Sequence, residues 1–84
     1  MYRITVKRSA ERELRRIDRP MIPRILVAIH NLAANPHPVG SRKLVGSEAE
    51  YRIRIGNYRV IYAVDEAEQV VDIQRIRHRK DAYP

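Results

Sequence analysis

The chain has 84 residues and carries 17 Lys and Arg against 10 Asp and Glu, which gives a formal net charge of +7. This length predicts one small domain over residues 1–84. The absence of cysteine excludes disulfide bonds, and His30, His37 and His78 lack the spacing of metal ligands, so we expect no metal or other cofactor. With no apolar run of about 20 residues and no signal segment, we expect a cytoplasmic protein without a membrane partner.

The positive charge is carried mainly by arginine, which supplies 14 of the 17 cations. Guanidinium is a planar, permanently charged group that forms paired hydrogen bonds with phosphate, whereas lysine is a hydrated point charge. A solvated basic surface would explain the excess of charge but not this preference for arginine. The composition therefore leaves nucleic-acid binding and a merely soluble basic surface both open.

The first half of the chain predicts a strand followed by two helices. Apolar and polar residues alternate over residues 2–7, as in a half-buried strand. Ser9 is a plausible N-cap for a first helix with an apolar stripe. Pro20 and Pro23 fit only a first helical turn, so a second helix starts between them and ends at Asn35-Pro36.

The second half predicts a loop and three strands. Prolines and glycines mark residues 35–50 as a loop, and strands follow at about 50–56, 58–65 and 69–77. The fold class is therefore α+β, with two N-terminal helices packed on one face of a small antiparallel sheet in the order β-α-α-β-β-β.

The segment "YRIRIGNYRVIY", residues 51–62, reads as a hairpin with a two-residue Gly-Asn turn, which fixes the register of its strands. In this register six apolar residues face the helices, namely Tyr51, Ile53, Ile55, Tyr58, Val60 and Tyr62. Arg52, Arg54 and Arg59 share the opposite, exposed face, with Arg54 directly opposite Arg59. Opposed like charges repel, which favours an anionic partner. Arginines lying flat over the sheet are the alternative.

The last strand and the residues after it bring together further groups suited to phosphate chemistry. The apolar pattern changes phase near Gln74-Arg75, which predicts a β-bulge. Beyond it, His78 can move protons near neutral pH, Arg79 can stabilise a transition state and Tyr83 can stack on a base. A frayed basic tail is the alternative interpretation of this segment.

The segment "YRIRIGNYRVIY" followed by "HRKDAY" resembles the RelE/ParE superfamily of toxins from type II toxin–antitoxin systems, and is most similar to the RelE branch. The resemblance spans nearly the whole chain. It implies two helices on a small antiparallel sheet, and an endoribonuclease that cleaves messenger RNA in the ribosomal A site. In that reaction, which needs no metal, the 2′-hydroxyl attacks the adjacent phosphate. The partner implied is a RelB-like antitoxin.

The resemblance also implies roles for individual residues. Those matching catalytic positions are Arg52, Arg54, Arg59, Arg79 and Tyr83, while Arg77 and Lys80 complete the predicted RNA-binding set. The best-known RelE toxins have lysines in place of Arg52 and Arg54, one of them proposed as the general base. An arginine does not deprotonate at a useful pH, so His78 becomes the candidate base. The alternative is that no residue acts as the base and Arg54 contributes only through its charge.

Two other functions remain open from the sequence. A ParE-like toxin would inhibit DNA gyrase through protein contacts, and would not require the cluster of arginines with Tyr83. A non-catalytic nucleic-acid-binding module would use the arginines only to position phosphates.

Overall fold

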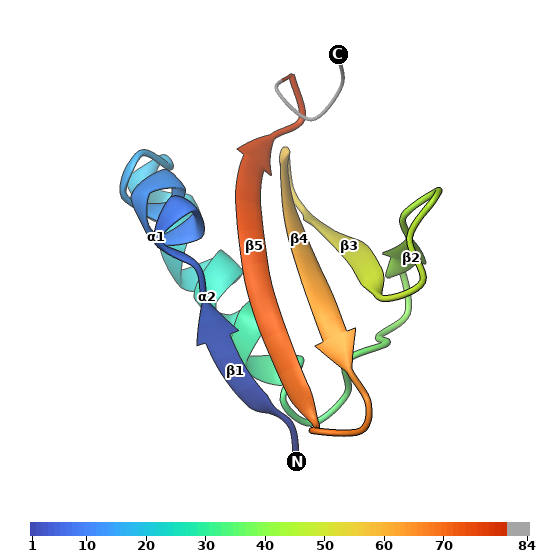
Figure 1. Ribbon diagram of the computed structural model, residues 1–84. Helices are drawn as coiled ribbons and strands as arrows, with labels where there is room; N and C mark the ends of the chain where they lie inside the picture. The colour runs from blue at the N-terminus through green and yellow to red at the C-terminus, as the bar shows by residue number, and fades with distance from the viewer. Residues whose placement is uncertain (81–84) are drawn as a thin grey trace.

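The computed structural model describes residues 1–80, and these form a five-stranded sheet with helices packed against it (Figure 1). The elements are β1 (Arg3–Val6), α1 (Arg8–Arg15), the 3-10 helix η1 (Arg19–Met21), α2 (Ile22–Asn31), β2 (Arg42–Lys43), β3 (Glu50–Ile55), β4 (Tyr58–Asp65) and β5 (Val70–His78). Within these residues the strand order is β1-β5-β4-β3-β2, and only β1 pairs in parallel. The predicted α+β class is confirmed, with a mostly antiparallel sheet and one strand more than predicted.

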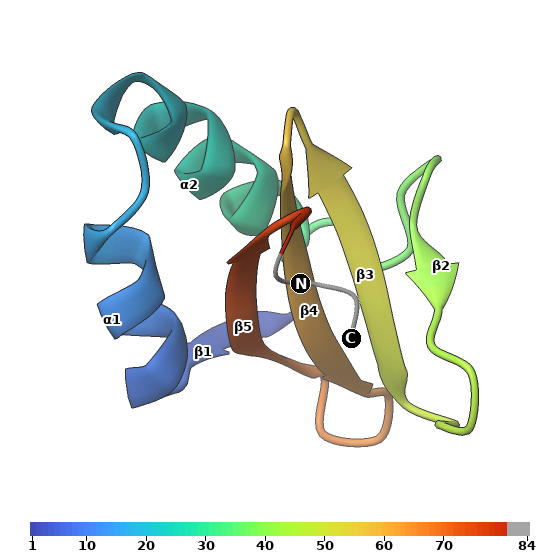
Figure 2. The same ribbon diagram turned by 90° about the horizontal axis from the view of Figure 1, so that it is seen from above.

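Both long helices cover the same face of the sheet, which leaves the other face open (Figure 2). Pro23 lies in the first turn of α2 and Pro20 in η1, as predicted. The prediction that Ser9 caps the first helix is wrong, because α1 begins at Arg8 after Lys7. The Ser9 hydroxyl instead donates to the Gln74 carbonyl at 3.0 Å, so it fastens α1 to β5. Across residues 1–80, no helix has the length and apolarity that a membrane span requires.

The β3–β4 hairpin has the predicted register. Ile55 pairs with Tyr58 and Arg54 with Arg59, on either side of the Gly56-Asn57 turn. Gly56 has φ +61 whereas Asn57 has no positive φ, which is the pattern of a type II′ turn. A Cβ at Gly56 would lie 2.8 Å from the Met21 methyl carbon, which is the end of a flexible side chain and can move aside, so the positive φ is the main reason why this position favours glycine.

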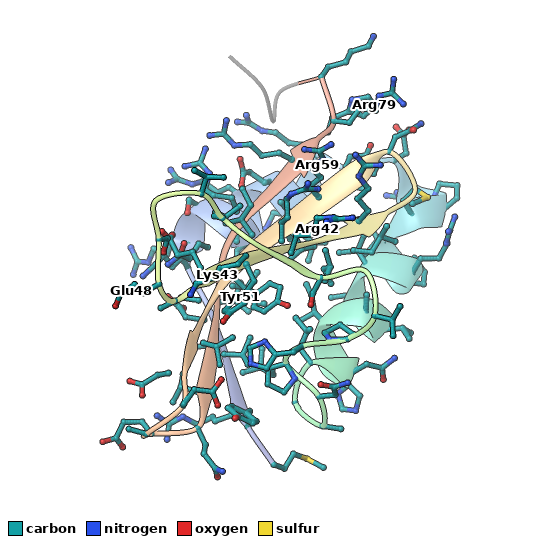
Figure 3. All side chains as sticks on the ribbon, turned by 90° about the vertical axis from the view of Figure 1, so that its right-hand side faces the viewer. Arg42, Lys43, Glu48, Tyr51, Arg59 and Arg79 are labelled. Atoms are coloured by element: carbon teal, nitrogen blue, oxygen red, sulfur yellow. The ribbon has the colours of Figure 1, made fainter. Side chains whose placement is uncertain are left out.

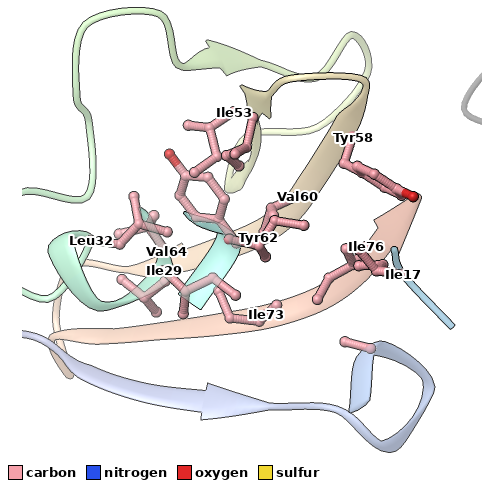
Figure 4. Packing of buried hydrophobic residues seen from close by; sticks show 14 residues of the cluster. Ile17, Ile29, Leu32, Ile53, Tyr58, Val60, Tyr62, Val64, Ile73 and Ile76 are labelled. Atoms are coloured by element: carbon pink, nitrogen blue, oxygen red, sulfur yellow. The ribbon is translucent and has the colours of Figure 1, made fainter. Parts of the chain in front are cut away.

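The core lies between the helices and the inner face of the sheet (Figure 4). Tyr62 is the largest fully buried side chain among residues 1–80, and its hydroxyl donates to the Pro36 carbonyl at 2.7 Å. Burial raises the pKa of Tyr62 to about 12, so the hydroxyl stays a neutral donor. Of the six residues predicted to face the helices, five are buried and Tyr51 is half-buried. The predicted core face of the hairpin is therefore confirmed.

The predicted β-bulge is present in β5. Ile61 of β4 pairs with Arg75 and the next residue, Tyr62, pairs with Ile73, which leaves Gln74 as the extra residue. The bulge lets Ile73 and Ile76 both reach the core although they lie three residues apart.

Candidate nucleic-acid interface

The open face of the sheet carries arginines from β2, β3, β4 and the β5 end of the chain. Arg42 pairs with Arg52 across β2 and β3, and Arg59 pairs with Arg54 on one side and Arg77 on the other. Figure 3 shows Arg42, Arg59 and Arg79 following one another along this side of the molecule. We call this set the arginine face; its members are Arg42, Arg52, Arg54, Arg59, Arg75, Arg77 and Arg79.

The structure brings three predicted residues together in one pocket at the hairpin end of the arginine face. Arg54, Arg59 and Arg79 line this pocket of about 270 Å³, whose remaining wall is the β3–β4 turn. The Arg79 N–H donates to the Asn57 carbonyl at 2.7 Å, which extends the β4–β5 ladder and holds Arg79 against the turn. Each guanidinium can form two parallel hydrogen bonds to one anion, so three of them around one concavity make a site suited to phosphate.

Exposure differs among the arginines. Arg54 is exposed and Arg52 is half-buried, but Arg59 is only 6% exposed. The prediction that all three share one face is confirmed, whereas the prediction that all three are exposed is wrong for Arg59. Its neighbours across the strands are Arg54 and Arg77, whose side chains are long enough to lie over it. A buried cation interacts more strongly with an anion than an exposed one does, because water screens it less.

One carboxylate from α1 organises the β5 side of the arginine face. Glu13 Oε1 accepts the Ile76 N–H at 2.9 Å, and Oε2 lies 3.2 Å from Arg75 Nη2 and 3.5 Å from Arg77 Nε. The ion pairs hold these two arginines toward the edge of the sheet. Four other members of the arginine face differ, since no ion pair forms on Arg42, Arg52, Arg54 or Arg79 within residues 1–80.

His78 is not brought to this pocket. It pairs with Tyr58 on the helix-covered face, where the two rings meet edge to face with centroids 5.2 Å apart. There His78 and Lys80 line a separate cavity of about 610 Å³. The sequence held the signal for this placement, because after the bulge Ile76 faces the core and His78 follows it by two residues.

Two further predicted residues have different outcomes. Arg77 lies on the arginine face as the neighbour of Arg59, whereas Tyr83 lies outside the described residues and its role stays a prediction. The sequence-based prediction missed Arg42 and Arg75. Arg42 lies in a two-residue strand, which is too short to show a periodic pattern. Among residues 1–80, no group of three His, Asp or Glu side chains is placed to hold a metal ion.

Known proteins are similar to this chain in sequence and architecture. A family profile described as the ParE toxin of type II toxin–antitoxin systems, parDE, matches residues 4–83. The toxin RelG of Mycobacterium tuberculosis is 32% identical over 98% of this chain and 95% of its own, and the toxin RelE of the same organism is 29% identical over 98% and 86%. The archaeal RelE from Pyrococcus horikoshii, solved in complex with RelB, superposes with a TM-score of 0.84 at 28% identity, covering 95% of this chain and 97% of the other.

Proposed function

Because the chain belongs to the ParE toxin family and is a RelE-like toxin of a type II toxin–antitoxin system, we propose that it is an endoribonuclease that cleaves messenger RNA in the ribosomal A site. The observation that supports this proposal is the pocket formed by Arg54, Arg59 and Arg79. A toxin that acted through protein contact alone would not need three arginines around one phosphate-sized concavity.

The proposed reaction is an attack by the 2′-hydroxyl oxygen on the adjacent phosphorus. The new P–O2′ bond forms as the P–O5′ bond breaks, which leaves a 2′,3′-cyclic phosphate and a 5′-hydroxyl. The attacking hydroxyl loses its proton to solvent, and the departing oxygen gains one from solvent. Arginine keeps its proton throughout, so Arg54, Arg59 and Arg79 act by stabilising the added negative charge on the phosphoryl oxygens.

Arg59 is the member of the set whose placement best suits this role. It is almost fully buried between its neighbours, so its guanidinium is already positioned when a phosphate enters. Preorganised charge needs no rearrangement in the transition state and is therefore worth more than a mobile cation. Arg54 and Arg79 would close on the phosphate from the two sides of the β3–β4 turn.

We further propose that the toxin acts in the cytoplasm and is held inactive by a RelB-like antitoxin. The Pyrococcus relative was solved bound to RelB, which supports such a partner here. The surface of α2 exposes Leu26 at 47% and Val27 at 60%, which offers apolar area for an antitoxin helix. An acidic antitoxin segment would also complement the arginine face.

The proposal is tested by adding the purified protein to programmed ribosomes and mapping the messenger RNA. We expect cleavage within the A-site codon by the parent protein and none by Arg59→Ala or Tyr83→Ala, with all three proteins folded.

The family profile carries the name of ParE, which favours gyrase inhibition as the second candidate. Gyrase-dependent DNA damage without cleavage would select that function, and RNA binding without either activity would select a non-catalytic module.

A further inference from the structure

The short strand β2 builds a second cationic pocket beside the first. Its pairing with β3 sets Arg42 directly opposite Arg52. These two arginines, with Val39, Gly40, Ile53 and Arg54, line a concavity of about 350 Å³. Arg54 also lines the pocket that holds Arg59 and Arg79, so the two concavities share a wall.

We propose that this second pocket is a subsite for single-stranded RNA that binds the phosphate next to the one in the first pocket. Arg42 lines the second pocket and not the first, so it tests the subsite separately. The proposal rests on the proposed function, because both pockets would hold one RNA strand. The strand then runs across the open face from the β3–β4 turn toward β2.

The spacing of the two pockets fits successive phosphates. Arg52 and Arg54 are two residues apart on β3, and such residues lie roughly 7 Å apart along a strand. That is comparable to the distance between neighbouring phosphates of an extended single strand. Arg54 can therefore contact both phosphates, while Arg42 and Arg52 contact only the second.

The charges of the second pocket are arranged for an anion. Arg42 and Arg52 are opposed across the strands, which is repulsive unless an anion lies between them. Neither arginine forms an ion pair with any carboxylate of residues 1–80. Structural arginines on this face, such as Arg75, are in contrast paired with Glu13.

The rim of the pocket suits a nucleotide rather than a free anion. Val39 is fully exposed and Gly40 has φ +94 with no atoms near its missing side chain, so this wall is apolar and open. An exposed apolar side chain beside two cations can lie against the face of a base while the phosphate sits below it. This makes the expected ligand a polynucleotide segment.

Lys43 provides a matched control within the same strand. It is exposed like Arg42 and carries the same charge, but it pairs with Tyr51, so it projects to the opposite face from Arg52. Arg42→Ala and Lys43→Ala therefore remove the same charge from adjacent positions. Only the first removes it from the second pocket.

The experiment measures binding of two 2′-O-methyl RNA probes, which lack the attacking hydroxyl, by NMR titration at several salt concentrations. For a hexanucleotide we expect Arg42→Ala to weaken binding about tenfold and to lower the slope of log affinity against log salt by about 0.7. Lys43→Ala should change the affinity less than about twofold. For a dinucleotide, whose single phosphate fills only one pocket, Arg42→Ala should leave the affinity unchanged.

Three results would overturn the subsite. They are equal losses in Arg42→Ala and Lys43→Ala, an equal loss for both probes in Arg42→Ala, or no hexanucleotide binding by the parent. Thermal melts check that each variant is folded, and Arg42→Lys should recover part of the lost affinity. Failure of the proposed function gives a different pattern, because parent protein would then leave ribosomal messenger RNA intact even if Arg42→Ala weakened hexanucleotide binding selectively.

Discussion

The open face of the sheet has two ends of opposite charge that are organised differently. At the hairpin end lie the arginines of β2, β3 and β4. At the other end a shallow cavity of about 730 Å³ is lined by one cation, Arg3, and by four carboxylates, namely Asp65, Glu66, Glu68 and Asp72. Most of these carboxylates form hydrogen bonds or ion pairs with other groups of the chain. Asp72 accepts the Thr5 hydroxyl at 2.8 Å and lies 3.0 Å from Lys7 Nζ. The Asp65 carboxylate accepts the Glu68 N–H at 2.9 Å.

Glu66 is bound from two directions. It accepts the Tyr2 hydroxyl, and its other oxygen lies 2.8 Å from His37 Nε2. Glu66 thus joins the residue before β1, the loop after α2 and the β4–β5 turn. On the arginine face, Arg42, Arg52, Arg54 and Arg79 have no such ion pairs within residues 1–80. Charges that are satisfied within the fold hold it together, whereas cations left without counter-ions are available for a ligand.

The largest expected effect comes from removing a cation at the hairpin end. Arg79→Ala should lower single-turnover cleavage on programmed ribosomes by about 10²–10³-fold, because the pocket loses a preorganised charge. The free energy of unfolding should change by no more than about 0.5 kcal/mol, since Arg79 is exposed.

Lys80→Ala is the control for this experiment. Lys80 is the next residue and carries the same charge, but it lines the cavity on the other side of the sheet with His78. We expect a loss of less than about threefold. Equal losses in the two variants would mean that net charge, and not the pocket, supports cleavage.

A second prediction concerns Glu13, the carboxylate that forms ion pairs with Arg75 and Arg77 of the arginine face. Glu13→Ala should destabilise the fold by about 1–3 kcal/mol, because the Ile76 N–H loses its acceptor and two arginines lose their partner. Glu13→Gln keeps an acceptor and should cost less than Glu13→Ala. Urea denaturation measures both, with Glu11→Ala on the exposed side of α1 as the control. Equal stabilities of all three variants would exclude this structural role.

The sequence predicts features that depend on neighbouring residues, and it does not predict contacts between residues far apart in the chain. The hairpin register and its two faces follow from local rules, since a two-residue turn and a period of two determine which arginines lie together. The bulge near Gln74 was likewise visible as a change of phase. The pairing of Glu13 with Arg75, and the bond from Tyr2 to Glu66, join residues far apart in the chain, and no local pattern contains them. The parallel pairing of β1 with β5 was missed for the same reason.

A third prediction tests whether the helix-covered face takes part in catalysis. The sequence predicted His78 as the general base, but its ring packs against Tyr58 on that face. We therefore expect His78→Gln to leave the single-turnover rate within about threefold of the parent and the pH profile unchanged, because a general base must reach the proton it removes. A loss of about 10²-fold, together with loss of a step in the pH profile, would restore the predicted role of His78.

The smallest expected effect lies at the carboxylate end. The hydrogen bond from Tyr2, and then that from His37, lower the pKa of Glu66 below its ordinary value of 4.5. A carboxyl whose pKa is lower in the folded state adds stability that is fully present above the ordinary value and is lost as the pH falls through the folded value. Glu66→Gln should therefore lower Tm by no more than about 2 °C at pH 7. The difference from the parent should begin to shrink as the pH falls below about 4.5, and it should disappear once the pH lies below the lower pKa that Glu66 has in the folded state.

Glu68→Gln is the matched control, because Glu68 lies in the same turn and its side chain forms no ion pair within residues 1–80. It removes the same charge, so any general effect of making the protein more basic appears in both variants. Only Glu66→Gln should show a loss of Tm that depends on pH, and neither should change cleavage. A loss of cleavage in Glu66→Gln would show that the carboxylate end is functional, and the division of the sheet into a structural and a ligand-binding end would then fail.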